Sequence, residues 1–168
     1  ILDKGIRNTL LAIAAFIFTI IGLLVANVVL TRPMSPEQMQ AIGFYQFEQS
    51  RGISEFKMID HFGNNVGLPE FKGKWTLLFF GFTTCPDICP TTLGVLNKAL
   101  EGLDEPPQVV MVTVDPERDT SEKLKNYVPA FNSKFRGFVG SFDQTVRLAE
   151  QLNIAFGKIP GSVPGTYL

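Results

Sequence analysis

The hydrophobic pattern of the chain begins with a long uncharged segment near the N-terminus. Asn8 to Thr31 is 24 residues without a charged side chain, bounded by Arg7 and Arg32. At about 1.5 Å per residue, a helix of this length is roughly 36 Å long, enough to cross a hydrocarbon core of about 30 Å. The segment therefore predicts a single transmembrane anchor.

Other interpretations of this segment fit it less well. Its length, lack of charge and apolarity on all sides argue against a buried core helix. It is longer than the core of a signal peptide, and Ala26-Asn27-Val28 is a poor cleavage site. No cysteine directly follows, which excludes a lipoprotein anchor. Because Lys4 and Arg7 outnumber Arg32, we expect the N-terminus inside and the rest outside, in the bacterial periplasm or the mitochondrial intermembrane space.

The region after the anchor is predicted to be a linker. Ser35, followed by Pro36, predicts the N-cap and first residue of a helix, and a short amphipathic segment continues to about Ser50. The aromatic residues at 44, 45 and 47 are expected to rest either on the bilayer interface or on the domain. The chain thus divides into a flank, an anchor, a linker helix and one domain, at residues 1–7, 8–31, 32–51 and 52–168.

From residue 52 the pattern alternates short apolar strands with helical spacings. A β-hairpin is expected from strands at 53–61 and 66–71, and Asp119 with Glu122 resembles a capping box for a helix at 121–131. Asp143 is expected to cap another helix. The remaining predictions are strands at 76–80, 108–114, 138–140 and 166–168, a helix after residue 88, an extended piece at 154–159 and a loop at 160–165. This order predicts a three-layer α/β domain with a mainly parallel sheet.

Composition and charge narrow the function classes. The chain is 45% hydrophobic with a mean hydropathy of +0.17, which fits a membrane segment plus a globular domain with a real core. A formal net charge of −1 gives no electrostatic support to nucleic-acid binding. The chain starts at Ile1 instead of a methionine and stops at Leu168 in a strand-forming pattern, so we expect the protein to continue at both ends.

The chain has two cysteines, Cys85 and Cys89, between a predicted strand and a predicted helix. A helix N-terminus lowers the pKa of a thiol, and positions i and i+4 of a helix share a face. Two ionisable sulfurs are therefore expected side by side and near solvent. A disulfide across so short a loop removes little entropy from the unfolded chain, so stabilisation of the fold is a poor explanation for the two cysteines.

Three chemistries use such sulfurs: thiol–disulfide exchange, soft-metal binding with a third ligand, and peroxide reduction beside an arginine. The spacing is one residue wider than the Cys-x-x-Cys of thioredoxins. It suits a metal as well as a disulfide, although Pro86 and Pro90 limit the movement that disulfide closure needs. A fourth interpretation, two buried thiols in a core, is disfavoured by these prolines and by Asp87. The loop at Asp115 is expected to neighbour the cysteines, because both follow carboxyl ends of strands.

The segment from Phe79 to Leu93, with its Cys-Pro-Asp-Ile-Cys-Pro centre, resembles the signature of the Sco/SenC family of membrane-anchored copper proteins. Asp115-Pro116-Glu117-Arg118-Asp119-Thr120 resembles that family's second motif. The segments at 60–63 and 71–75, which precede the cysteine motif, also resemble those of the family. The single N-terminal anchor is a further similarity. The resemblance covers about residues 52–168 and implies a thioredoxin-like fold with an N-terminal β-hairpin.

The resemblance also implies one bound copper ion, Cu(I) or Cu(II), with Cys85 and Cys89 as ligands. It implies that this copper is delivered to the dinuclear CuA centre of cytochrome c oxidase subunit II, with other copper carriers as further partners. The third ligand of the family is a histidine, expected here beyond Leu168. Asp87, Asp115 and Arg118 are expected at the rim of the site, although a local turn and ion pair explain Asp115 and Arg118 equally well.

His61 is the one histidine of the chain, and it does not match the family's ligand. We expect it to be a residue of the hairpin turn, with metal ligation as the alternative.

The leading functional hypothesis is that the protein is a copper metallochaperone and not an enzyme. The alternative is an anchored thiol–disulfide oxidoreductase that reduces the cysteines of the CuA site, using Cys85 and Cys89 as its redox pair. A scaffold that needs neither cysteine is the third hypothesis.

Overall fold

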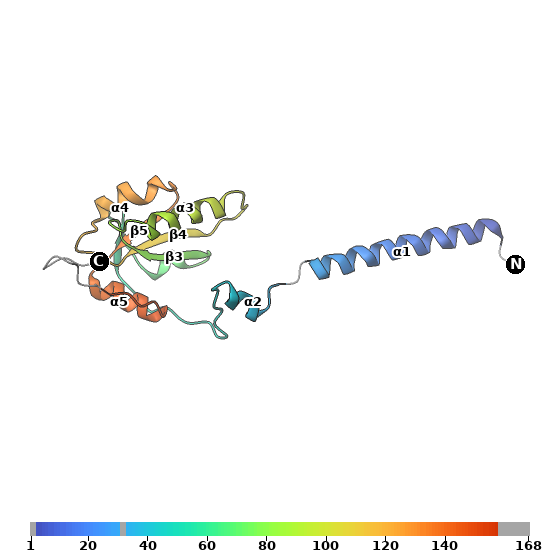
Figure 1. Ribbon diagram of the computed structural model, residues 1–168, viewed down its shortest axis with the longest axis horizontal. Coiled ribbons are helices and arrows are strands. Elements are labelled where there is room, and N and C mark those ends of the chain that lie inside the picture. Colours follow the sequence, from blue (N-terminus) through green and yellow to red (C-terminus); the bar gives the residue numbers. More distant parts are fainter. Residues whose placement is uncertain (1–2, 31–32, 158–168) are drawn as a thin grey trace. The chain divides into compact units, whose positions relative to one another are not determined.

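The structure is a computed structural model that describes residues 3–30 and 33–157 (Figure 1). The loop expected at 160–165, the strand at 166–168, Arg32 and the ends of two predicted segments lie outside the described residues. The chain forms two compact units, Ile1–Arg51 and Gly52–Leu168.

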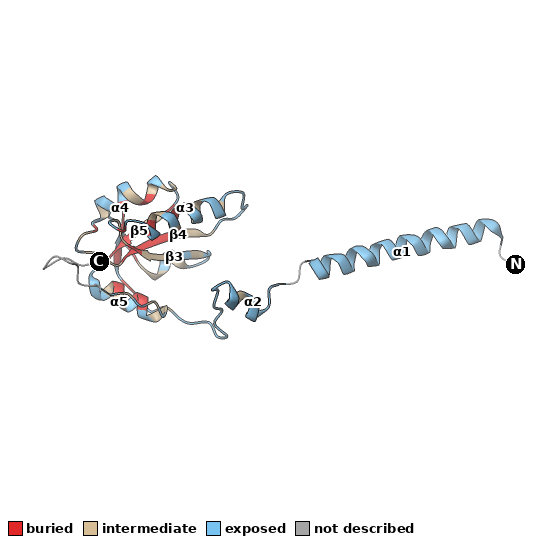
Figure 2. Cartoon of the chain, viewed as in Figure 1, coloured by how far each residue is buried: buried red, intermediate tan, exposed pale blue. Residues whose placement is uncertain are grey.

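The first unit contains one long apolar helix, α1 (Lys4–Leu30), which is exposed along its whole length (Figure 2). Its 27 residues are long and apolar enough to cross a membrane, so the expected N-terminal apolar helix is confirmed.

A short helix, α2 (Pro36–Ala41), follows in the first unit. Ser35 caps it as predicted, since its Oγ accepts a hydrogen bond from the backbone N–H of Gln38. The expectation of a helical segment to about Ser50 is wrong: α2 ends at Ala41, and the φ of +81° at Gly43 marks the turn that follows.

The second unit holds five strands, three α-helices and two 3-10 helices among its described residues. They are, in chain order, β1 (Met58–Asp60), β2 (Asn65–Val66), η1 (Leu68–Phe71), β3 (Thr76–Gly81), α3 (Ile88–Leu100), β4 (Gln108–Thr113), α4 (Ser121–Tyr127), η2 (Val128–Ala130), β5 (Arg136–Val139) and α5 (Phe142–Gln151).

The strands form one sheet in the order β2-β1-β5-β4-β3. β3, β4 and β5 run parallel, with Gly81 opposite Thr113 and Val112 opposite Phe138, while β1 pairs antiparallel with both β2 and β5. The predicted hairpin and mainly parallel sheet are confirmed. Since β3 and β4 are adjacent and parallel, the loops that leave their carboxyl ends meet at one edge of the sheet.

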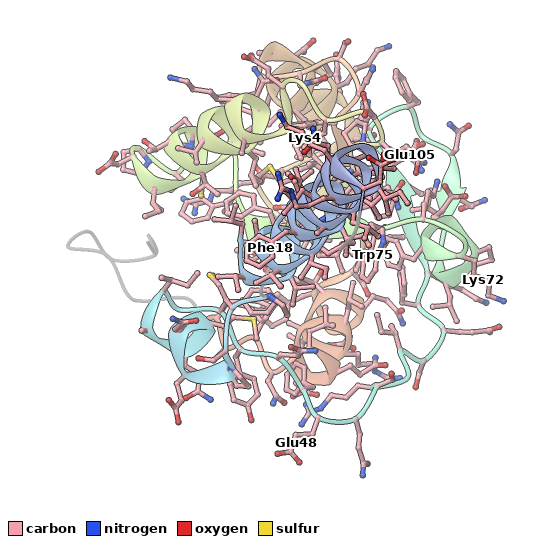
Figure 3. All side chains as sticks on the ribbon, turned by 90° about the vertical axis from the view of Figure 1, so that its right-hand side faces the viewer. Lys4, Phe18, Glu48, Lys72, Trp75 and Glu105 are labelled. Atoms are coloured by element: carbon pink, nitrogen blue, oxygen red, sulfur yellow. The ribbon has the colours of Figure 1, made fainter. Side chains whose placement is uncertain are left out.

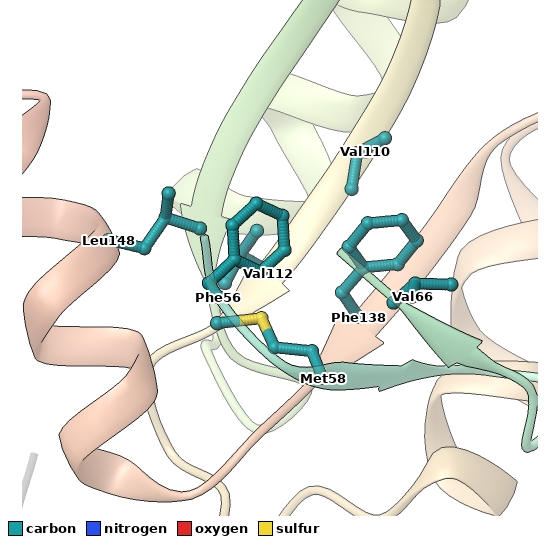
Figure 4. Close-up of a cluster of buried hydrophobic side chains, with 7 residues drawn as sticks. All are labelled: Phe56, Met58, Val66, Val110, Val112, Phe138 and Leu148. Atoms are coloured by element: carbon teal, nitrogen blue, oxygen red, sulfur yellow. The ribbon is translucent and has the colours of Figure 1, made fainter. Parts of the chain in front are cut away.

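Helices cover both faces of the sheet. Successive residues of β4 point to opposite faces. Val109 and Met111 pack with Leu93 of α3 and Leu124 of α4. On the other face is a second cluster, drawn in Figure 4, with Leu148 of α5; its members are Phe56, Met58, Val66, Val110, Val112, Phe138 and Leu148. The predicted three-layer arrangement is therefore confirmed.

Both hairpin strands are shorter than predicted, and β1 covers only Met58–Asp60 of the strand expected at 53–61. β2 ends at Val66, and η1 replaces the strand expected to reach Phe71. Pro69 explains this change, because proline has no backbone N–H for a strand ladder but fits an early helical position. The turn that follows, with Gly73 at a φ of +75°, leads to Trp75, which is 87% exposed (Figure 3).

Two helix caps also differ from the predictions. Thr120, not Asp119, caps α4, because its Oγ1 accepts the backbone N–H of Lys123. Ser141, not Asp143, caps α5. The predicted helix at 121–131 ends at Tyr127 and continues as η2, since Pro129 interrupts the backbone hydrogen bonds of an α-helix.

Candidate metal centre

Cys85 lies in the loop between β3 and α3, and Cys89 lies in the first turn of α3. The two are adjacent: the backbone N–H of Cys89 donates to Sγ of Cys85 over 3.4 Å. The N-cap residue Asp87 makes no side-chain cap bond, so the sulfur of Cys85 takes the place of a capping oxygen. The predicted side-by-side sulfurs at a helix N-terminus are therefore found, although Cys85 itself precedes the helix.

The expectation that the pair lies near solvent is wrong. Cys85 is 9% exposed and Cys89 is 4% exposed. Cys89 packs against the end of β3, where a side chain at Gly81 would bring a Cβ within 3.2 Å of its Sγ. A side chain at Gly81 would meet the Phe79 ring first, at 2.7 Å, so glycine leaves room here for both that ring and the Cys89 sulfur.

The two thiols differ in acidity. Burial alone raises the pKa of Cys85, but hydrogen bonds from the Cys89 thiol and from the N–H groups of Cys89, Asp87 and Ile88 lower it below its ordinary value. Burial, together with the hydrogen bond donated to Cys85, raises the pKa of Cys89 to about 11. Cys85 is thus the more acidic thiol of the pair, and Cys89 is the hydrogen-bond donor between them.

This asymmetry predicts selective alkylation. At pH 7.5 iodoacetamide should modify Cys85 first, and Cys89 about 100-fold or more slowly, because the thiolate is the nucleophile. Peptide mass spectrometry after timed quenching measures both rates. In urea the two rates should converge, and equal rates in the folded chain would contradict the assignment.

Asp119 is the residue of this site that the sequence misassigned as a helix cap. It is fully buried, and its carboxylate accepts hydrogen bonds from the N–H of Thr83 (2.9 Å), from the Thr83 hydroxyl and from the Thr113 hydroxyl (2.7 Å). Its negative charge contributes to the raised pKa of Cys89, after burial and the Cys85 hydrogen bond. Asp119 therefore ties the segment before Cys85 to the end of β4.

The expected neighbourhood of the two loops is confirmed by these contacts and by the N–H of Val114, which donates to the carbonyl of Gly81 over 3.0 Å. The position of Asp119 in the sequence could have indicated its role. Thr83 follows β3, while Thr113 ends β4 and Asp119 follows it. Because β3 and β4 are adjacent and parallel, all three residues lie at the same edge of the sheet.

The other predicted rim residues lie in the same two loops. Asp115 is 3% exposed and forms an ion pair with Arg118. The Arg118 guanidinium is 5.8 Å from the ring centroid of Phe82, three residues before Cys85. Asp87 is exposed on the cysteine loop. Their roles as rim residues remain predictions.

His61 lies away from the cysteines, in the hairpin turn as predicted. Its Nδ1 accepts the backbone N–H of Gly137 over 3.0 Å, near the start of β5, whereas Cys85 follows the end of the parallel strand β3. His61 is thus held beside β5, on the far side of β4 from β3, and the structure does not bring it together with the cysteines. Within the described residues, no three His, Cys, Asp or Glu side chains gather as a metal site.

His61 predicts a pH-dependent stability. It is 2% exposed, and burial lowers its pKa from the ordinary 6.5, so the unfolded chain binds this proton more readily than the folded chain. Stability should be full above pH 6.5 and fall by about 1 kcal/mol between pH 7.5 and 5.5. Urea unfolding at both pH values measures this, and His61→Gln should remove the difference. An unchanged pH dependence in this variant would contradict the prediction.

The sequence of this chain is similar to those of known proteins. A family model described as SCO1/SenC matches residues 46–168. The mitochondrial SCO2 homologue of Danio rerio is 33% identical over 141 residues, which are 79% of this chain and 50% of the relative. The chain spans about half the length of the curated relatives it matches.

Solved structures are similar as well. The crystal structure of Arabidopsis thaliana ScoI with copper bound is 35% identical, with a TM-score of 0.64, over 70% of this chain and 75% of that chain. Yeast Sco1 with copper bound is 30% identical, with a TM-score of 0.60, over 70% and 67%. These matches confirm the thioredoxin-like fold.

Proposed function

The chain belongs to the SCO1/SenC family, and from that premise we propose that it is a copper metallochaperone that delivers copper to the CuA centre of cytochrome c oxidase subunit II. The observation that carries the proposal is the adjacent pair of reduced sulfurs at the start of α3. The crystal structures of relatives with copper bound support copper as the metal. The description of the Sco family as cytochrome c oxidase assembly proteins supports the oxidase as the target.

The donor set fits copper as a cargo. Two cysteine sulfurs are soft ligands, which suit Cu(I), and they lie together at a largely water-excluded position. Copper entry replaces the proton that Cys89 shares with Cys85, and that proton leaves to solvent. Two thiolates hold Cu(I) in two-coordinate form but bind Cu(II) poorly. The third donor, a histidine expected beyond Leu168, stays a prediction.

We further propose that α1 anchors the domain in the membrane, with the copper site on the periplasmic or intermembrane-space side. The support is the length and apolarity of α1 and the excess of Lys4 and Arg7 at its start. In this role the anchor confines the copper site to the membrane surface where the oxidase assembles. Asp87 and Arg118 are then rim residues that a partner meets, and the buried Asp115 holds Arg118 through their ion pair.

The second candidate function is reduction of the CuA cysteines, and the unequal thiols favour it. A low-pKa Cys85 is suited to attack a disulfide, and the neighbouring Cys89 is suited to resolve the mixed disulfide. This reaction forms a Cys85–Cys89 disulfide and leaves two thiols on the target, so electrons balance within the pair.

One experiment separates the two functions. The copper-loaded chain is mixed with the soluble domain of subunit II in its reduced, copper-free form. Metallochaperone function predicts appearance of the CuA absorption spectrum and loss of copper from the chain. A result in which only the disulfide form of the target reacts, and only with copper-free chain, would instead establish the reductase.

A further inference from the structure

Trp75 is the one tryptophan of the sequence, and its side chain lies almost wholly in solvent. The residue is 87% exposed, at the turn between η1 and β3 (Figure 3). Among the described residues its ring stacks on no other ring and on no cation. An exposed indole leaves a large apolar area in contact with water, so this side chain contributes little to the stability of the domain.

The backbone holds this turn in a defined shape. Gly73 has a φ of +75°, a conformation that favours glycine, and the N–H of Gln108 in β4 donates to the carbonyl of Trp75 over 3.0 Å. Lys72 and Lys74 are both exposed, and neither forms an ion pair with any residue that the structure describes. The fold thus presents an indole beside two ammonium groups, and the domain uses none of the three for its own packing.

This combination of side chains fits a lipid surface. Tryptophan places its ring at the headgroup level of a bilayer, and lysine extends its ammonium group to the lipid phosphates. A protein-binding hot spot, by contrast, is surrounded by close-packed neighbouring contacts, whereas Trp75 directly follows Lys72, Gly73 and Lys74. The turn therefore has the chemistry of a membrane interface more than that of a protein interface.

The same chain brings a lipid surface within reach. α1 is long and apolar enough to span a membrane, so a bilayer lies near the domain wherever α1 is inserted. A tethered contact acts at an effective concentration of the order of millimolar. A turn of four residues is too small to hold a free domain on a membrane, but it can stay bound when the domain is anchored.

Charge alone does not explain contact with an anionic bilayer. The loop that leads into β4 lies at the same edge of the sheet, because β3 and β4 start side by side, and it carries exposed Glu101, Asp104 and Glu105. These carboxylates oppose the charges of Lys72 and Lys74. Burial of the indole is therefore the main favourable contribution, and the lysines decide which part of this edge makes the contact.

We propose that the turn Lys72–Trp75 binds the surface of the bilayer that α1 spans, with the indole among the lipid headgroups and the two lysines on phosphates. The inference rests on the proposed membrane anchor and is independent of the copper chemistry. The Sγ of Cys89 lies beside Gly81, at the opposite end of β3 from Trp75. The six residues of β3 separate the two by roughly 20 Å, at about 3.3 Å per residue. Contact with lipid at the turn therefore leaves the copper edge of the sheet free for a partner.

Trp75 is itself the probe for a test, because the sequence has no other tryptophan. The full chain is reconstituted in nanodiscs of phosphatidylethanolamine and phosphatidylglycerol, with a scaffold protein that lacks tryptophan. Lipids brominated near the top of the acyl chain should quench Trp75. Iodide in solution should quench it about fivefold less than it quenches N-acetyltryptophanamide, since headgroups shield an interfacial ring. The emission maximum of Trp75 should lie at shorter wavelength than that of the free analogue.

A second probe position is the matched control. Ile88→Trp combined with Trp75→Phe moves the indole to the first turn of α3, where the native residue is 70% exposed beside the cysteine loop. This probe should be quenched by iodide and not by brominated lipid. Lys72→Glu together with Lys74→Glu should reduce the bromine quenching of Trp75 about twofold or more, because each lysine attracts the anionic surface.

Equal quenching by iodide at the two probe positions would overturn the inference. Shielding of Trp75 from iodide without quenching by brominated lipid would also overturn it, since protein and not lipid then covers the ring. Unchanged bromine quenching in the double lysine variant would contradict the contact of the lysines with phosphates. Each of these results leaves the proposed copper function and the anchor standing. Failure of the chain to remain in the nanodiscs would instead overturn the anchor together with this inference.

Discussion

Replacing Cys85 or Cys89 by serine should abolish copper binding and leave the fold intact. Changes to groups that only surround a metal ligand already cost about 10–100-fold in affinity, so loss of one of two sulfur ligands should exceed about 100-fold. Serine has nearly the shape of cysteine, and its hydroxyl is a hard ligand that does not suit Cu(I). The expected stoichiometry falls from about one copper per chain to near zero.

The copper content of purified chains, measured by elemental analysis, checks this result, and circular dichroism checks the fold. Cys85→Ser should leave the first N–H groups of α3 satisfied, because the serine hydroxyl can accept as an N-cap does. Retention of full copper content in either variant would contradict the assignment of ligands. Oxidase assembly in cells by both variants would instead support a scaffold that needs neither cysteine.

The parts of the fold that sequence predicted well are those with a strong one-dimensional signal. α1 follows from a continuous uncharged run, and β4 from an uninterrupted apolar run that is buried on both faces. The cysteine pair was also predictable, because its adjacency depends only on spacing at a strand–helix junction. In each case the deciding interactions lie within the segment or on its two faces.

Sequence failed where neighbouring residues compete for one role. Asp119 and Thr120 are both good N-caps, and the local pattern favoured Asp119 because Glu122 follows it. The structure uses Thr120 instead, because two donors of Thr83 in the cysteine loop and the hydroxyl of Thr113 in β4 enclose the Asp119 carboxylate. That choice depends on strands that pair only in three dimensions.

The burial of the sulfurs was missed for the same reason. Flanking prolines and an aspartate indicate an exposed loop, and Pro86 and Asp87 are indeed exposed. Cys85 and Cys89 nevertheless turn inward, and the lack of a side chain at Gly81 leaves room for the Cys89 sulfur at the end of β3. The site is thus a largely buried pair beneath an exposed loop.

Asp119→Ala should destabilise the domain more than any other single change at the site outside the cysteines. It leaves the Thr83 N–H, the Thr83 hydroxyl and the Thr113 hydroxyl without their acceptor in a buried position. At about 1–3 kcal/mol for each unsatisfied buried group, with partial relief by water, the expected loss is about 3–5 kcal/mol. The melting temperature should fall by roughly 10 °C or more.

Glu122→Ala is the matched control, because the sequence pattern pairs Glu122 with Asp119 in one capping box. If Asp119 acts as the structure indicates, Glu122→Ala changes stability by less than about 0.5 kcal/mol, as surface substitutions do. If Asp119 were only a helix cap, its own loss would cost about 1 kcal/mol, close to the loss in Thr120→Ala. Urea unfolding of the three variants separates these outcomes. A large loss in Asp119→Ala alone would establish that this carboxylate holds the loop before Cys85 against the end of β4, and thereby fixes where the first sulfur ligand lies.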